Sequence, residues 1–230
     1  MRILVTRPLE DGREIARLLA ERGHQPLLSP LLEPRFRGDL LPEEVLDGAQ
    51  AVLATSANGI RALVRSTARR DLSIFAVGPQ TADEARAAGF SDVRSADGDA
   101  KALAEATRHW APPHAPLLHV CSEDAPGTLS HLLSQSGFTV RRCALYTIEP
   151  AKQLTAEAKA ALQNRALDAV MFFSPRTARI FGQLTEGLPT DGLTALCISQ
   201  ASADALAPLA FAQIRIAARP RQDAMLALIE

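Results

Sequence analysis

Short apolar runs alternate with amphipathic helical patterns along the whole chain, and this alternation most constrains its fold. Runs such as ILVT at 3–6 and AVLAT at 51–55 have the length of buried strands. Between the runs, apolar residues recur near the helical period, as at Ile15, Leu18 and Leu19. Such alternation is typical of parallel sheets covered by helices on both faces. We therefore predict an α/β protein.

The chain also repeats itself, and the repeat indicates two domains. TSANGIRAL at 55–63 aligns with FSPRTARIF at 173–181, and AVGPQTADEARAAGF at 76–90 aligns with CISQASADALAPLAF at 197–211. LLAERGHQPLLSPLLEP, ending at Pro34, aligns with LLSQSGFTVRRCALYTIEP, ending at Pro150. A repeat this long does not suit a solenoid, so we predict two similar, doubly wound parallel-sheet domains of the flavodoxin-like kind.

Both long segments of the repeat end in Glu-Pro, which suggests that each crosses from one domain to the other. The first strand–helix unit would then belong to the C-terminal half. We predict one discontinuous domain from 1–33 plus 151–230, a second from 36–142, and antiparallel linker strands at 31–36 and 143–149, with a cleft between the domains. Two domains in simple sequence order remain the alternative.

Several classes of protein are not expected from this composition. The net charge of −1 favours neither nucleic acid nor an anionic membrane as a partner. No apolar run approaches the roughly 20 residues of a membrane span, and MRILVTRPLE is not a signal peptide. Three widely separated cysteines are typical of a reducing compartment. We therefore expect a cytoplasmic protein without a membrane or nucleic-acid partner.

Motifs for familiar cofactors and nucleophiles are absent from the sequence. There is no G-x-G-x-x-G after the first strand, no G-x-x-x-x-G-K-[ST] and no G-x-S-x-G. The five histidines show no metal-ligand spacing, and His119 lies inside a predicted strand, where a structural role is expected. We expect neither a metal nor a cofactor.

Hydroxyl, glycine and arginine residues instead follow the predicted strands, where ligands of open α/β sheets bind. Serine and threonine at such places are often only N-caps, but several helix N-termini together offer many N–H groups to anions. Arginine can add bidentate contacts to carboxylates. The candidate ligand-binding residues are Thr6, Arg7, Ser56, Ala57, Asn58, Gly78, Thr81, Ser122, Ser174, Arg176, Ser199 and Ser202.

Six motifs, in order, resemble the uroporphyrinogen-III synthase family over nearly the full chain. They are ILVTRP, TSANGIRAL, AVGPQTADEARAAGF, ALYTIEP, FFSPRTARIF and AARPRQDAMLALI. The resemblance implies two α/β domains joined by a two-stranded ladder, with the first strand–helix unit in the C-terminal half. It also implies a lyase that closes hydroxymethylbilane, a linear tetrapyrrole with eight carboxylates, to uroporphyrinogen III. Water is lost, and the last ring is inverted through a spiro intermediate.

The resemblance also bears on individual residues. Ser56, Thr81, Ser174 and Ser202 match the family's hydroxyls that line its cleft, and Tyr146 matches a linker tyrosine that points into it. We predict that the Tyr146 hydroxyl assists the departing hydroxyl group, although strand packing alone would also explain an aromatic residue there. The chain departs from the family pattern at Cys121-Ser122, where many members have Arg-Gly, and at Ser199-Gln200-Ala201-Ser202, where a second G-P-x-T is expected.

A non-catalytic two-domain protein that binds a small polyanion is the alternative function. For the enzyme, we expect a monomer that receives the tetrapyrrole, with a transient handover from the enzyme that makes hydroxymethylbilane.

Overall fold

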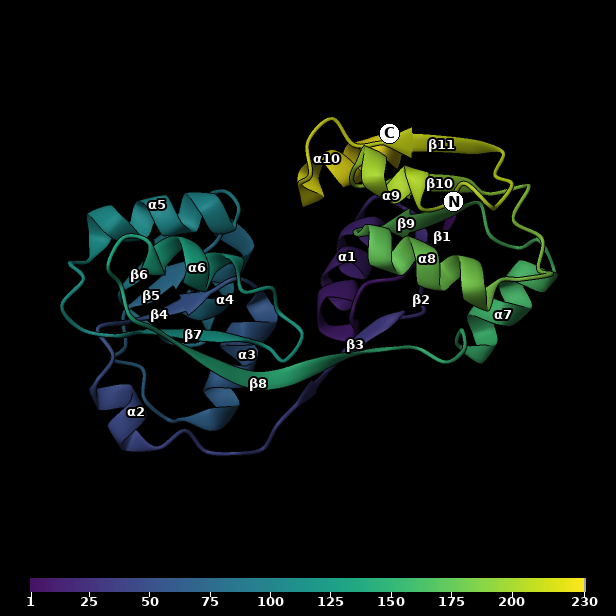
Figure 1. Ribbon diagram of the computed structural model, residues 1–230. Helices are drawn as coiled ribbons and strands as arrows, with labels where there is room; N and C mark the ends of the chain where they lie inside the picture. Colours follow the sequence, from purple (N-terminus) through teal and green to yellow (C-terminus); the bar gives the residue numbers. More distant parts are fainter. Residues whose placement is uncertain (230) are drawn as a thin grey trace. The chain divides into compact units, whose positions relative to one another are not determined.

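The computed structural model describes residues 1–229, which form two compact units (Figure 1). Unit 1 combines Met1–Glu33 with the chain from Glu149 onward, and unit 2 is Pro34–Ile148. Each unit is built around one sheet with helices packed against it (Figure 1). The α/β class predicted from the alternating pattern is confirmed.

The sheet of unit 1 has the strand order β11-β10-β9-β1-β2, and its neighbouring strands are parallel. Its elements are β1 (Arg2–Val5), α1 (Leu9–Glu21), β2 (Gln25–Leu28), α7 (Ala156–Gln163), β9 (Ala169–Phe172), α8 (Pro175–Leu184), β10 (Thr194–Cys197), α9 (Gln200–Asp204), β11 (Gln213–Ile216), α10 (Gln222–Leu226) and the 3-10 helix Ala227–Ile229.

Both faces of this sheet are buried, which explains why its central strands are apolar throughout rather than alternating. Along β1, Ile3 and Val5 pack in a cluster with residues of α1 and α10. Leu4 faces the opposite way and packs in a second cluster with residues of α7, α8 and α9. Successive side chains of one strand thus contribute to two separate cores.

The sheet of unit 2 has the order β3-β8-β7-β4-β5-β6. Helices α3 and α4 pack on one face, and α5 and α6 pack on the other. Its elements are β3 (Leu32–Phe36), α2 (Glu43–Asp47), β4 (Ala51–Ala54), α3 (Ala57–Ser66), β5 (Ile74–Ala76), α4 (Pro79–Ala87), β6 (Val93–Ser95), α5 (Ala100–Trp110), β7 (Leu117–Ser122), α6 (Thr128–Ser134) and β8 (Val140–Pro150).

The two sheets share one topology in a circularly permuted form. In unit 2 the strands β8-β7-β4-β5-β6 occupy successive places, and in unit 1 the same places are held by β2-β1-β9-β10-β11. The chain of unit 2 runs through this arrangement without a break, whereas unit 1 is assembled from the two ends of the sequence. This correspondence gives the internal sequence repeat its structural meaning, because aligned segments such as 55–63 and 173–181 form equivalent helices, α3 and α8.

The chain passes between the units in β3 and β8, which are neighbouring strands. Arg37 N–H donates to the Leu145 carbonyl at 2.8 Å, and Ala151 N–H donates to the Leu31 carbonyl at 3.0 Å, so the pair is antiparallel. The expected linker 143–149 is not a separate strand. It belongs to β8, which begins at Val140, and its residues up to Tyr146 pair in parallel with β7.

The apolar residues from Gln25 to Leu32 predict a single strand in the sequence, and this prediction is wrong. The structure ends β2 at Leu28 and begins β3 at Leu32. Pro30 has no N–H to donate to a ladder. Ser29 is fully buried, and its hydroxyl accepts a hydrogen bond from Thr155 N–H at 3.1 Å, which fixes the break.

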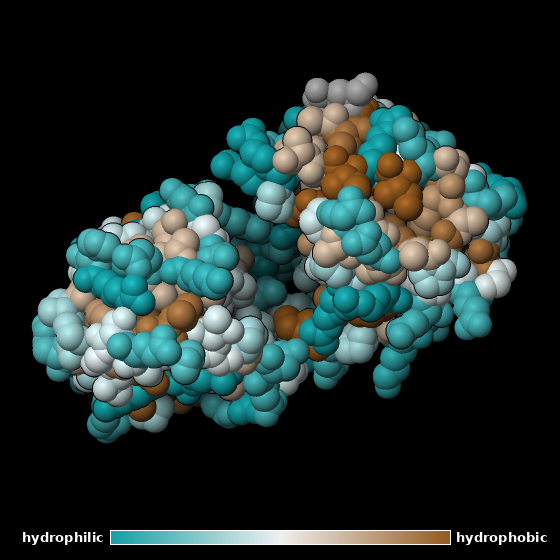
Figure 2. Space-filling view, turned by 45° about the horizontal axis from the view of Figure 1, so that its top comes forward, coloured by the Kyte–Doolittle hydropathy of each residue, from teal (hydrophilic) through white to brown (hydrophobic). Residues whose placement is uncertain are grey.

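The surface that Figure 2 shows is largely hydrophilic or neutral, with apolar patches on each unit. The large apolar residues that are exposed are Met1, Leu9, Leu40, Ile214 and Ile216. Within residues 1–229, no helix is both long and apolar enough to cross a membrane. The three cysteines are free.

The packing of α3 against β7 leads to a stability prediction. A Cβ atom at Gly59 would lie 2.9 Å from the Val120 carbonyl oxygen, closer than real contacts allow. We expect Gly59→Ala to lower the free energy of unfolding by about 1–3 kcal/mol, since overpacking against backbone outweighs the helix propensity gained. Urea unfolding followed by circular dichroism measures this change.

Gly182→Ala in α8 is the matched control. Its Cβ would lie 3.8 Å from Leu209 Cδ1, an ordinary contact. That variant should be unchanged or more stable by up to about 1 kcal/mol. Equal stability of Gly59→Ala and the original chain would contradict the close packing.

Candidate functional site

Each sheet has one place where the strand order reverses, and ligands of open α/β sheets bind outside the carboxyl ends of the strands there. In unit 2 this place lies between β4 and β7, and in unit 1 between β1 and β9. Ser56 follows β4, and Ser122 ends β7. Tyr146 of β8 is the register partner of Ser122, just after a bulge at Cys121/Ser122. Three predicted site residues of unit 2 are therefore neighbours.

Tyr146 is buried at this position and held by contacts on several sides. Its hydroxyl lies 2.8 Å from Ser56 Oγ, and the residue is only 4% exposed. Its ring lies 6.0 Å from the Phe36 ring and belongs to the same apolar cluster as Ile60 and Val120. The ring is thus packed in the core of unit 2, while the hydroxyl contacts a polar partner.

The pKa of Tyr146 is raised above its ordinary value, chiefly because burial disfavours the charged phenolate. Hydrogen bonds from Ser56 and Ser122 act in the opposite direction, and the charges of Cys121 and Asp124 add to the increase. The phenol therefore keeps its proton at neutral pH and can act as a hydrogen-bond donor.

Three of the predicted serines are N-caps, as the alternative interpretation expected. Each has an extended backbone, and its hydroxyl accepts from the N–H of the third residue of the helix that follows. Ser56 accepts from Gly59 at 3.2 Å, Ser174 from Thr177 at 3.1 Å, and Ser199 from Ser202 at 3.3 Å. Capping fixes the directions of the helix N-termini at the carboxyl ends of the strands.

Other predicted hydroxyls are also buried in this structure. Thr6 is 0% exposed, and its hydroxyl donates to the Met171 carbonyl at 2.7 Å, which ties β1 to β9. Ser202 is also 0% exposed and lies 3.1 Å from the Ser199 hydroxyl. Thr81 is 4% exposed within α4. The sequence alone does not distinguish such buried structural hydroxyls from exposed hydroxyls that could bind a ligand.

The two charged candidates, Arg7 and Arg176, also differ in burial. Arg7 forms a 2.7 Å ion pair with Asp11 in which both side chains are mostly buried, and its guanidinium lies over the Phe173 ring. Arg7 is therefore a structural residue of unit 1. Arg176, the second residue of α8, is exposed.

The remaining candidates offer backbone rather than side-chain groups. Asn58 accepts from Arg61 at 3.1 Å, within its own helix. Ala57 is the first residue of α3. Gly78 precedes α4, whose first turn has no side-chain cap. The N–H groups of this turn are suited to an anion.

His119, predicted to be structural, is buried in β7. Burial and the nearby Arg142 charge lower its pKa to about 4, so the imidazole is neutral near pH 7. Its Nε2 lies 3.4 Å from the Thr55 hydroxyl. In the described part of the chain, no group of His, Cys, Asp or Glu residues has a geometry suited to a metal ion.

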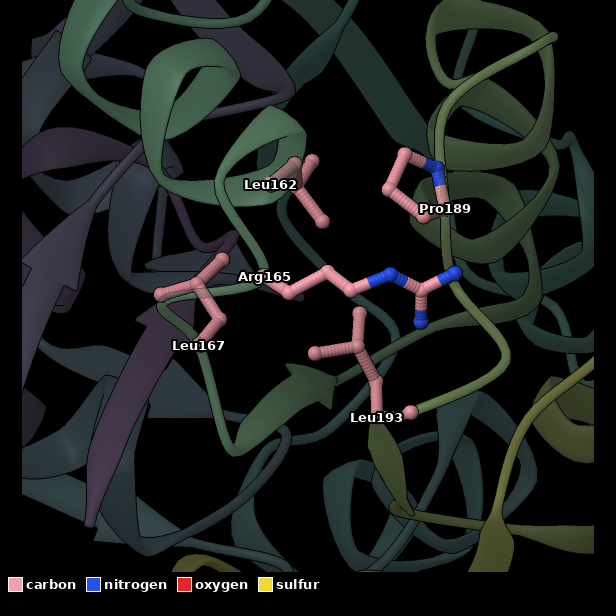
Figure 3. Close-up of a pocket in the computed structure, with 6 residues that line it drawn as sticks. Leu162, Arg165, Leu167, Pro189 and Leu193 are labelled. Carbon is pink, nitrogen blue, oxygen red and sulfur yellow. The ribbon is translucent and has the colours of Figure 1, made fainter.

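A pocket elsewhere in unit 1 involves none of the predicted residues (Figure 3). Its lining comes from the end of α7 and from the loops that lead into β9 and β10, at the amino ends of the strands, and comprises Leu162, Arg165, Leu167, Pro189, Gly192 and Leu193. Arg165 forms an exposed ion pair with Asp191 at 2.9 Å. Ligands of parallel sheets bind at the other edge, so this pocket is not the candidate site.

A family model described as "Uroporphyrinogen-III synthase HemD" matches residues 13–227. The chain belongs to the uroporphyrinogen-III synthase family. The resemblance seen in the ordered motifs is thereby confirmed. No curated protein matches the chain in a sequence search.

Solved structures of the family share this fold at low sequence identity. A uroporphyrinogen-III synthetase from Helicobacter pylori is 17% identical, with a TM-score of 0.66 over 100% of this chain and 98% of that one. A mutant uroporphyrinogen III synthase from the extremely thermophilic bacterium Thermus thermophilus is 19% identical, with a TM-score of 0.53 over 100% and 97%. The two-domain α/β fold is therefore common to this chain and to these enzymes.

Because Tyr146 is the only tyrosine, its ionisation can be measured directly from the absorbance of tyrosinate near 295 nm. We expect a midpoint above 10 in the folded chain and near 10 in urea, since burial raises its pKa. The sign follows from linkage. The neutral phenol stabilises the fold below about pH 10, and this contribution is lost as the pH rises through the folded midpoint.

A rapid pH jump reads the absorbance before the chain unfolds, and Tyr146→Phe supplies the blank. A folded midpoint at or below that in urea would show that the phenol is not held in an apolar site.

Proposed function

We propose that this chain closes hydroxymethylbilane to uroporphyrinogen III by holding the substrate with backbone and side-chain donors and by assisting the loss of water with Tyr146. Membership in the family supports the assignment of the reaction. The buried neutral phenol beside Ser56 supports the role proposed for Tyr146. The enzyme is a lyase of tetrapyrrole and heme biosynthesis.

The first step is departure of the terminal hydroxyl group. The Tyr146 phenol hydrogen-bonds to this oxygen and transfers its proton as the C–O bond breaks, so that water leaves. The substrate then returns its pyrrole N–H proton to the phenolate, which restores Tyr146 and gives the azafulvene. A raised pKa suits this role, because the phenol is fully protonated at neutral pH. It contributes by stabilising charge on the leaving oxygen rather than by attacking a bond.

The second step is ring closure with inversion. The last ring attacks through its substituted carbon to form a spiro intermediate, which fragments and recloses with that ring reversed. The chain controls which carbon reacts by fixing the geometry of the substrate. A tenfold change in product ratio requires only about 1.4 kcal/mol between competing transition states, well within what orientation supplies.

The eight carboxylates of the substrate require many donors on a chain whose net charge is only −1. The N-termini of α3, α4 and α8 supply backbone N–H groups beyond the strand ends, and Arg176 supplies an exposed cation. Ser122 is half-buried beside Tyr146 and can contact substrate as well. We assign substrate binding to these groups rather than to Thr6 and Ser202, which are fully buried.

We also propose that the protein acts in the cytoplasm as a monomer. It would receive the unstable substrate by transient handover from the enzyme that makes hydroxymethylbilane. A polar surface on both units and the reducing-type cysteine usage support this setting.

The decisive assay mixes the purified chain with hydroxymethylbilane, without added metal or cofactor. We expect uroporphyrinogen III as the main product, whereas the substrate alone closes to the symmetric isomer I. Chromatography of the oxidised porphyrins separates the isomers. Isomer I as the sole product in both samples would instead favour a binding protein without catalysis.

Tyr146→Phe tests the catalytic role, because it removes the hydroxyl and keeps the packed ring. General-acid assistance is typically worth about 10²–10⁴-fold, and we expect a loss of turnover at or below this range because the substrate loses its hydroxyl readily. Isomer III should remain the main product, since geometry controls the ring closure. Thermal unfolding of the variant, monitored in parallel, separates catalysis from stability. Turnover equal to that of the original chain would leave shape and backbone donors as the whole mechanism.

A further inference from the structure

The serine caps of this chain use their hydroxyls in two different ways. Ser174 caps α8, and its hydroxyl also lies 3.0 Å from the Thr177 hydroxyl of the same helix. Ser199 caps α9, and its hydroxyl lies 3.1 Å from the hydroxyl of Ser202. Both serines therefore find their second partner at the third position of their own helix. Ser56 is the exception.

Ser56 finds no hydroxyl at the third position of α3, because that position is Gly59. A side chain there would collide with the Val120 carbonyl oxygen of β7. The second contact of Ser56 is instead the Tyr146 hydroxyl on β8, at 2.8 Å. At the other two caps, the second contact of the serine hydroxyl lies within its own helix. At Ser56, the second contact lies on β8.

The hydrogen-bonding capacity of a serine fixes the direction of this contact during turnover. A hydroxyl has one hydrogen and two lone pairs. Ser56 Oγ accepts from the Gly59 N–H with one lone pair. If Tyr146 is to donate its proton to the substrate, it must accept from Ser56 rather than donate to it. The hydrogen of Ser56 then points at the phenol oxygen, and the phenol hydrogen points away from Ser56.

We propose that Ser56 is a positioning residue that donates to Tyr146 and directs the phenol proton toward the departing hydroxyl of the substrate. The result is a chain of three hydrogen bonds. The Gly59 N–H donates to Ser56 Oγ, Ser56 donates to the Tyr146 oxygen, and Tyr146 donates to the leaving oxygen. The first donor, the Gly59 N–H, lies in the first turn of α3, at the positive end of the helix dipole. Hydrogen bonds in series strengthen one another. This inference rests on the donor role proposed above for Tyr146.

The arrangement also explains why burial does not disable the phenol. Negative charge grows on the Tyr146 oxygen as its proton is shared with the leaving group. Ser56 supplies a hydrogen at that oxygen, and Ser122 lies beside it. The charges of Cys121 and Asp124 oppose this stabilisation. Loss of the Ser56 hydroxyl should therefore make the phenol a weaker acid. If Ser56 only capped α3, loss of its hydroxyl would not change the acidity of the phenol.

The first test is the tyrosinate titration of Ser56→Ala, read by rapid pH jump. We expect the midpoint of Tyr146 to rise by about half to one pH unit, the size of one neutral hydrogen bond. Ser56→Gly should give the same rise, and it removes the hydroxyl at little cost to helix capping. Ser174→Gly removes the equivalent hydroxyl in unit 1 and should leave the midpoint unchanged. An unchanged or lowered midpoint in both Ser56 variants would overturn the inference.

The second test is a double-mutant cycle on turnover. Ser56→Ala should slow the original chain by about two- to tenfold. In the Tyr146→Phe background it should have less than a twofold effect, since the hydroxyl it serves is gone. The same factor in both backgrounds would overturn the inference and identify Ser56 as an independent substrate contact. Unaltered turnover in Tyr146→Phe alone would remove the donor role itself, which is a different failure.

Discussion

At Gly59 the backbone of α3 comes so close to β7 that a Cβ atom would lie 2.9 Å from a carbonyl oxygen. This contact sets how deep the first turn of α3 sits over the sheet of unit 2. It places Ser56 within hydrogen-bond distance of Tyr146 on β8 and leaves no side chain to compete for the Ser56 hydroxyl. The geometry of the candidate site is therefore a result of backbone packing rather than of a dedicated loop.

Polar residues at the strand ends divide into two kinds by burial. Thr6 and Ser202 are fully buried and bond to the chain itself, and Arg7 neutralises Asp11 at the start of α1. Ser122 and Arg176 retain exposed surface. Buried polar groups must find partners inside the protein, so the first kind stabilises the framework. We propose that the second kind, together with helix N–H groups, binds the ligand.

Much of the fold follows from the sequence pattern. The fully apolar runs of β1, β4 and β9 predict parallel strands covered on both faces, because alternation is not needed when both sides are buried. The aligned repeats correspond to α3 and α8, which occupy equivalent places. The break at Ser29-Pro30 was missed, because the apolar residues on either side of it suggested one strand.

The candidate site was less predictable from the sequence than the fold. Tyr146 and Ser56 are each predicted as site residues, but nothing local pairs a strand residue with an N-cap residue that lies 90 positions away in the chain. The importance of Gly59 depends on its distance from Val120, which is a property of tertiary packing alone. The Asn-Gly after Ser56 was the only local signal, and it is also typical of a turn.

The permuted relation of the two units has a consequence for biosynthesis on the ribosome. The strands of unit 2 are consecutive in the chain, so its sheet can form while later residues are still being added. Strand β1 is made before unit 2 and can pair with β2, but it lacks its other neighbour, β9, until residues 169–172 have been added. The burial of its apolar side chains, including Ile3 and Val5, is completed only after that stage, because their cluster contains residues of β9 and α10. Unit 1 therefore depends on long-range closure and folds last, and its early strands need protection from aggregation in the interval.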